Sequence, residues 1–172
     1  MKNLYTICLL ALLTVSSTYK ATAQQLQSVY EGTWHYEDGN ELFIVSLWQE
    51  NDGTFSGYYK KVEYNNGTQG TVILNSRIVN NQGAVFPPVI FGRIDPENYM
   101  SGILIDNTLV EDVNDFKKGI LRIELIDSCT NCPYTATWKV SERSGLRVGF
   151  VPGFSVPTDV ILTKVSNTVD LD

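Results

Sequence analysis

The stretch that decides the fold class is residues 119–142, GILRIELIDSCTNCPYTATWKVSE. Before its central break, the apolar side chains of Leu121, Ile123 and Leu125 occupy every second position. After the break, the same period-two alternation returns around Trp138. Because successive side chains of a strand point to opposite faces, this pattern predicts two strands, each with a dry face and a wet face. A sheet that closes on itself, or packs on a second sheet, requires such faces.

Similar strand patterns recur along the chain. The candidate strands are 32–37, 41–50, 54–64, 71–77, 89–94, 99–106, 119–127, 134–142 and 159–165. The dipeptides Asp38-Gly39, Asp52-Gly53 and Asn66-Gly67 favour tight hairpins, because these residue types tolerate positive φ. Only 111–118, which is followed by the helix-ending Gly119, has the composition for a turn or two of helix. The sequence therefore predicts an all-β fold, a single antiparallel up-and-down β-barrel of about eight to ten strands.

Residues 1–23 have the pattern of a secretory signal. Lys2 supplies a positive charge, 4–15 (LYTICLLALLTV) is apolar, and Ala21-Thr22-Ala23 is a small-residue cleavage site. We expect cleavage after Ala23, with the barrel domain over 24–172 exported to the periplasm or outside the cell. The apolar stretch is shorter than the ~20 residues of a spanning helix, and no later stretch reaches that length, so we expect no membrane span.

The charge balance argues against nucleic acid as a partner. The chain has 13 Lys and Arg against 19 Asp and Glu, a net charge of −6 and a pI of about 4.7, whereas a phosphate binder needs a basic surface. With His35 as the sole histidine, we predict no catalytic residue, metal site or cofactor, and do not expect an enzyme. A Ca²⁺ site from Asp106, Glu111, Asp112 and Asp115 is the alternative to a solvated acidic loop, although their spacing differs from that of an EF-hand.

Cys129 and Cys132 lie at the expected hairpin tip between 119–127 and 134–142. In an exported protein this position favours a disulfide that pins the turn. A redox C-x-x-C site is less favoured, because its reactive thiol usually depends on a helix N-terminus. A zinc site would need two more ligands, and His35 is the only histidine available.

Gly32-Thr33-Trp34, which follows a short polar arm, resembles the G-x-W opening of lipocalin-like barrels. The resemblance implies that Trp34 plugs the closed end of the barrel and that Lys164, on the last strand, packs across its ring. The whole chain also resembles a family of small secreted bacterial proteins of unknown function. It shares with them the G-T-W opening, SGYYKK (56–61), PPVI (87–90) and GFSVPTDVILTK (153–164). That second resemblance implies no particular activity.

Aromatic residues gather on the predicted strands and on one long loop, 143–157. The candidate ligand-binding residues are Tyr36, Trp48, Tyr59, Trp138, Phe150 and Phe154. Small barrels either are filled by their own side chains or hold one small ligand, and the sequence leaves both open. The loop, which carries two of these Phe residues, either plugs one end of the barrel or gates a ligand mouth.

Two functions follow from this pattern. The leading expectation is a non-catalytic binder of a small hydrophobic or amphipathic ligand. The alternative is a cell-envelope or extracellular protein-interaction module that uses the outer sheet face or an edge strand. An exposed apolar patch or an uncovered edge strand would favour the alternative, and the sequence does not identify the protein partner.

Overall fold

The computed structural model describes residues 28–112, 115–126, 132–143 and 152–171, and every regular element within them is a strand. The strands are β1 (Gly32–Asp38), β2 (Glu41–Gln49), β3 (Phe55–Asn65), β4 (Thr68–Asn75), β5 (Ile90–Ile94), β6 (Met100–Asp112), β7 (Asp115–Ile126), β8 (Thr135–Glu142) and β9 (Asp159–Ser166). The all-β prediction is confirmed. The stretch 111–118, the one with a composition suited to a turn of helix, contributes to strands instead, because Val110 pairs with Phe116 and Asp112 with Asp115, which extends β6 and β7 as one hairpin.

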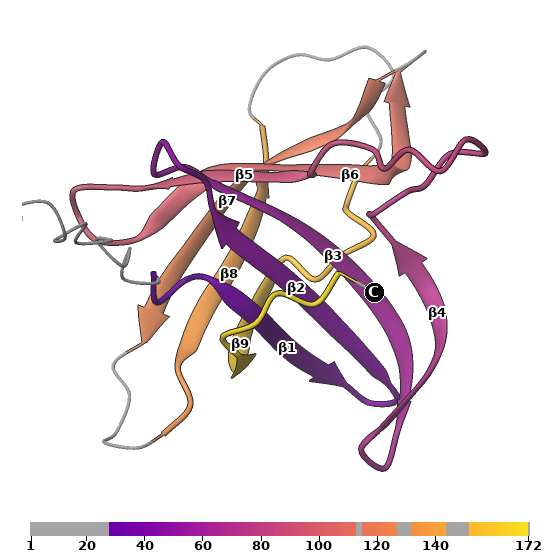
Figure 1. The fold of residues 1–172 in the computed structure, drawn as a ribbon, viewed down its shortest axis with the longest axis horizontal. Coiled ribbons are helices and arrows are strands. Elements are labelled where there is room, and N and C mark those ends of the chain that lie inside the picture. Colours follow the sequence, from indigo (N-terminus) through magenta and orange to yellow (C-terminus); the bar gives the residue numbers. More distant parts are fainter. Residues whose placement is uncertain (1–27, 113–114, 127–131, 144–151, 172) are drawn as a thin grey trace, which may run out of the picture.

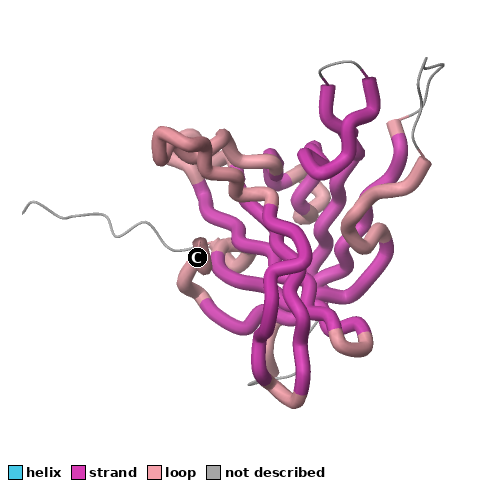
Figure 2. The backbone as a smooth tube through the Cα atoms, turned by 90° about the vertical axis from the view of Figure 1, so that its right-hand side faces the viewer, coloured by secondary structure: helices cyan, strands magenta, loops and turns pink. Residues whose placement is uncertain are grey.

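Eight of the strands close into an antiparallel barrel (Figure 1). The strand order is β2-β1-β9-β8-β7-β6-β5-β3-β4, and a further β2–β3 pairing joins β2 to the far side of the sheet. The last strand meets the first where Trp34 pairs with Lys164. The predicted single up-and-down barrel is therefore confirmed. Figure 2 shows the strands from the side, wrapped about a common axis with loops at the ends.

β4 lies outside this closed wall. β3 is long enough to pair with two strands, so Phe55, Ser56 and Gly57 face β5 while the segment from Lys60 onward faces β4. β4 comes last in the strand order, and its second edge has no partner strand among the described residues. In Figure 1 it stands at the margin of the barrel, and the chain passes through a loop before it returns as β5.

Inward-facing side chains pack against one another inside the barrel. Trp34, Phe43, Phe55, Tyr59 and Trp138 are each at most 2% exposed and belong to one apolar cluster. The Phe43 ring meets Trp138 edge-on at 5.6 Å between centroids and lies 6.1 Å from Tyr59. Such aromatic pairs add about 0.5–1.5 kcal/mol beyond the burial of their area. A second, smaller cluster of Leu42, Ile44 and Val62 packs apart from this one.

Two glycines, Gly92 and Gly102, lie opposite each other where β5 pairs with β6. A Cβ at Gly102 would collide with the carbonyl oxygen of Phe91 and would lie 2.7 Å from the Cα of Gly92. No other residue type fits such a close approach of two backbones.

The chain after β9 crosses the outer face of β1 and β2. The Thr33 hydroxyl donates to the carbonyl of Thr168 (2.7 Å) and accepts from the amide of Asp170 (3.0 Å). The Ser46 hydroxyl donates to the carbonyl of Asp170 (2.5 Å). Both hydroxyl residues are buried, so this tail satisfies polar groups that it covers. Lys60 of β3 completes the contact through an ion pair with Asp170 (3.0 Å).

Candidate interaction surface and barrel interior

The structure separates the aromatic residues predicted for a ligand site. Tyr59 and Trp138 are 1% and 0% exposed, and both rings lie next to the ring of Phe43 inside the barrel. Trp48 is on the opposite face of β2 from Phe43, where it lies 5.6 Å from the ring of Tyr58. The sheet therefore stands between Trp48 and the other two.

The remaining members of that set lie at the margins. Tyr36 and Phe154 are half-buried and pack against the edge of the core. Phe150 lies outside the described residues. The rings that do meet inside the barrel are core side chains in contact with one another, and this packing is the one that a filled barrel requires.

One end of the barrel interior is polar. Asp106 of β6 and Lys117 of β7 pair in register, and both are fully buried. The Asp106 carboxylate accepts hydrogen bonds from the Tyr59 hydroxyl (3.0 Å), the Thr108 hydroxyl (2.7 Å) and both the amide (2.6 Å) and hydroxyl (2.8 Å) of Ser155. These donors compensate for burial of the charge. Burial, together with the adjacent Asp106 charge, raises the pKa of the Tyr59 phenol, which keeps it a donor.

Residues 152–157, hereafter the strap, cover this polar end. Besides the Ser155 contacts, the Trp138 indole donates to the carbonyl of Pro157 (2.8 Å) and the amide of Gly153 to Glu142 (3.1 Å). Lys117 forms an ion pair with Glu142 (2.9 Å), and its ammonium lies 4.9 Å from the centre of the Phe154 ring. Of the two roles expected for the loop 143–157, its described part packs as a plug.

Trp34 and Lys164 meet at the other end of the barrel. The buried Trp34 indole donates to the carbonyl of Tyr30 (3.0 Å). The Lys164 ammonium lies 5.8 Å from the centre of the indole ring and donates to the carbonyl of Val29 (2.9 Å). Burial lowers the pKa of this ammonium. Gly32, with φ of 128°, allows β1 to approach β9 there, because a Cβ would collide with the carbonyl of Ser166.

The other chemistry-bearing candidates are dispersed. Cys129 lies outside the described residues, so its disulfide with Cys132 stays a prediction. His35 is half-buried on the outer face of β1, and burial lowers its pKa, opposed by the carboxylates of Asp170 and Glu37. Within the described ranges, no three His, Cys, Asp or Glu side chains gather to hold a metal ion. The same ranges contain no helix long and apolar enough to cross a membrane.

Residues 68–88, hereafter the extension, carry a concentration of exposed apolar side chains. The extension comprises β4 and the segment that follows it. Its exposed large residues, 36–53% accessible, are Val72, Ile73, Ile78, Val79, Val85 and Phe86. Ile73 is an additional residue of β4 at a register shift against β3, between the pairs Leu74–Lys61 and Val72–Val62. These six side chains are all exposed within one short segment of the chain.

The extension is held in place by hydrogen bonds. Val79 and Val85 form a bridge, flanked by the bonds from the Phe86 amide to the Ile78 carbonyl (2.9 Å) and from the Asn80 amide to the Ala84 carbonyl (2.9 Å). The Tyr58 hydroxyl of β3 donates to the Phe86 carbonyl (2.6 Å). The apolar side chains are thus displayed from an ordered backbone.

Sequence reasoning predicted a strand in this region but missed its surface character. The signal was present, because Arg77 is the only charged residue between Glu63 and Arg93. Natural edge strands are usually protected by charges, especially Lys, or by Pro. β4 (TQGTVILN) contains neither.

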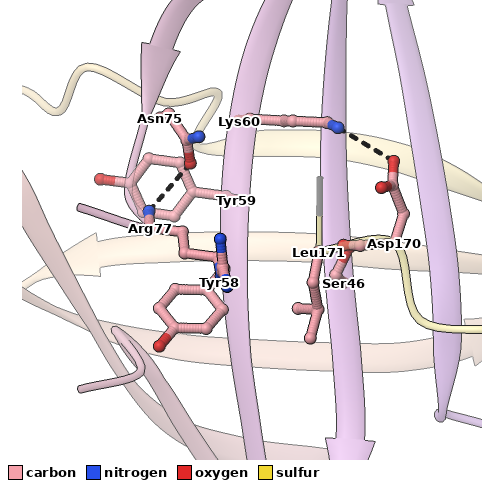
Figure 3. Close-up of a pocket in the computed structure, with 8 residues that line it drawn as sticks. All are labelled: Ser46, Tyr58, Tyr59, Lys60, Asn75, Arg77, Asp170 and Leu171. Atoms are coloured by element: carbon pink, nitrogen blue, oxygen red, sulfur yellow. Dashed lines mark hydrogen bonds and ion pairs between the residues drawn. The ribbon is translucent and has the colours of Figure 1, made fainter. Parts of the chain in front are cut away.

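The extension and the tail meet at a small cleft (Figure 3). Its lining residues are Ser46, Tyr58, Tyr59, Lys60, Asn75, Arg77, Asp170 and Leu171. Asn75 accepts a hydrogen bond from the Arg77 amide (2.9 Å), and Lys60 is paired with Asp170. The cleft has a volume of about 10 Å³, which is room for roughly one water molecule. It is a junction between two segments, too small for an organic ligand.

A second apolar row crosses the outside of β5, β6 and β7. Phe91 pairs with Ile103, and Ile103 with Ile120. All three are exposed, and a groove of about 410 Å³ runs beside the first two. Arg93 and Arg122 lie on the same face of this wall, so this row is less uniformly apolar than the extension.

No protein-family model, no curated protein and no solved structure matches this chain.

Proposed function

We propose that this chain is a non-catalytic protein-interaction module, in which the barrel is a scaffold and the extension binds a protein partner. The proposal depends on the edge of β4, which has no partner strand within the described ranges, and on the exposed apolar residues of 68–88. An edge strand offers a row of backbone donors and acceptors to an incoming strand. Pairing at such an edge supplies affinity, and adjacent side chains supply specificity.

The barrel itself supports a scaffold role. Its interior is occupied by side chains such as Phe43, Tyr59 and Trp138, each at most 2% exposed. The eight-stranded wall closes without β4, so the extension is not needed to complete the barrel. An ordered segment that displays apolar residues outside a complete fold is expected to bind something.

Site-specific photo-crosslinking in cells of the native host tests this proposal. A photoreactive amino acid at Val79, in the extension, should give covalent adducts with a polypeptide. The matched control is Ile161 on β9, which is also well exposed. Adducts from Val79 that disappear with Val72→Lys, and none from Ile161, would support the proposal. Equal labelling from both positions, or none from Val79, would refute it.

A second candidate is the small-ligand function, with an amphipathic molecule at the polar end of the barrel. It is favoured by a specific observation, the side-chain oxygen of Asn107, which is buried without a hydrogen-bond partner among the described residues. An unsatisfied buried acceptor near a polar layer can receive a donor from a ligand head group. Quenching of the fluorescence of Trp138 by amphipathic molecules, lost with Asn107→Leu, is the expected result. Equal quenching in both proteins would count against it.

A further inference from the structure

We infer that the partner of the extension is a second copy of this chain, bound by antiparallel pairing of β4 with β4 across a two-fold axis. This inference rests on the proposed function and names its partner. It depends on the charge, the symmetry and the backbone of the extension.

Charge is the first argument. The chain carries a net charge of −6, so two copies repel each other across most approaches. Between Glu63 and Arg93 the single charged residue is Arg77, and it is positive. Two copies that meet along the extension therefore bring no carboxylates of this segment together. Like charges placed opposite each other on neighbouring strands would destabilise the pair, and here there are none on β4.

Backbone geometry is the second argument. The outer edge of β4 has no partner strand among the described residues, and an antiparallel copy can satisfy its donors and acceptors. A two-fold axis between Val72 and Ile73 sets Val72 of each copy opposite Ile73 of the other, which is the self-complementary arrangement of an isologous dimer. β-Branched side chains pack well across neighbouring strands.

The hairpin of the extension adds apolar area next to that seam. Val79, Val85 and Phe86 are exposed on a backbone fixed by the Val79–Val85 bridge. In the dimer the hairpin of each copy flanks the paired strands and covers apolar area that is exposed in a single copy. Burial of this area, together with strand pairing, is the source of the affinity.

Light scattering and sedimentation of the purified chain up to about 100 µM test the inference, because a micromolar dimer is populated at that concentration. We expect a dimer for the wild type and a monomer for Ile73→Lys, which places two ammonium groups near the axis. The control is Ile120→Lys, on the second apolar row, with nearly the same exposure (50% against 47%). This control should remain dimeric, and all variants should keep the wild-type circular dichroism spectrum.

A charge-swap experiment separates pairing at β4 from a general loss of folding. Ile73→Lys and Ile73→Glu should each be monomeric alone, and an equimolar mixture should form a heterodimer. A monomeric wild type, or a dimer that is dissociated by Ile120→Lys but not by Ile73→Lys, would overturn the inference. If the wild type is monomeric while Val79 crosslinks to a different polypeptide, the inference fails and the proposed function stands. If Val79 gives no adduct at all, both fail.

Discussion

Replacement of Asp106 by Ala should destabilise the protein strongly. The carboxylate is fully buried and accepts bonds from Tyr59 (3.0 Å) and from the Ser155 amide (2.6 Å). The variant leaves both donors without an acceptor in the interior, at about 1–3 kcal/mol each. Thr108, which is exposed, can turn its hydroxyl to water. The expected decrease in the free energy of unfolding is therefore about 3–5 kcal/mol, the range measured when a buried charge network is broken.

Urea unfolding, followed by tryptophan fluorescence, measures this change. The matched control is Asp159→Asn, at an exposed aspartate, which should change the free energy of unfolding by no more than about 0.5 kcal/mol. Asn at position 106 should cost less than Ala, because its amide oxygen can still accept one of the bonds. A loss below about 1 kcal/mol for Asp106→Ala would show that the network does not anchor the strap as the hydrogen bonds indicate.

Further predictions concern the close strand crossing, the base of the barrel and the response to pH. Gly102→Ala should lower the free energy of unfolding by about 1–3 kcal/mol, because the added Cβ collides with backbone atoms. Gly70→Ala should cost less in the same urea titration, because there the added Cβ contacts the Glu63 side chain. Trp34→Ala should cost about 3–5 kcal/mol and half-buried Trp48→Ala clearly less, as compared by thermal unfolding. Burial lowers the pKa of His35 from 6.5, so as the pH falls through that value the unfolded chain binds a proton first. Stability should accordingly decrease from about pH 7 downward, and less steeply in His35→Gln.

Most of the barrel was predictable because the alternation of apolar and polar residues along a strand indicates which of its faces is buried. The run Ala136, Trp138 and Val140 alternates with polar residues, and the same three residues are buried in β8. Where this alternation of apolar and polar residues is absent, the strand residues were not predicted. The acidic and lysine-rich stretch 107–118 shows no clean period, and the pairing that extends β6 and β7 is determined by each strand's partner instead of by its own composition.

The candidate surfaces were predictable only in part. Period-two counting onward from Leu104 places Asp106 inside the barrel, yet its acidic neighbours made a solvated loop the simpler interpretation. Its contact with Ser155 spans 49 residues, and no local pattern encodes such a distance. The stretch between Glu63 and Arg93, with Arg77 as its one charged residue, was visible in the sequence. Only the strand order showed that it borders an edge with no partner strand in the described part of the chain.

The junction of β1 with β9 has a consequence for how the chain reaches its native state. The hydrogen bonds from Thr33 to Thr168 and from Lys164 to Val29 each join residues 135 positions apart. Contacts of such long range carry a large loop-closure entropy and slow the search for the native topology. While a ribosome still holds the last segment, the first strand lacks one of its two neighbours. Closure of the barrel is therefore a late folding step. Removal of residues from the carboxyl end should leave an open intermediate that exposes apolar surface and aggregates.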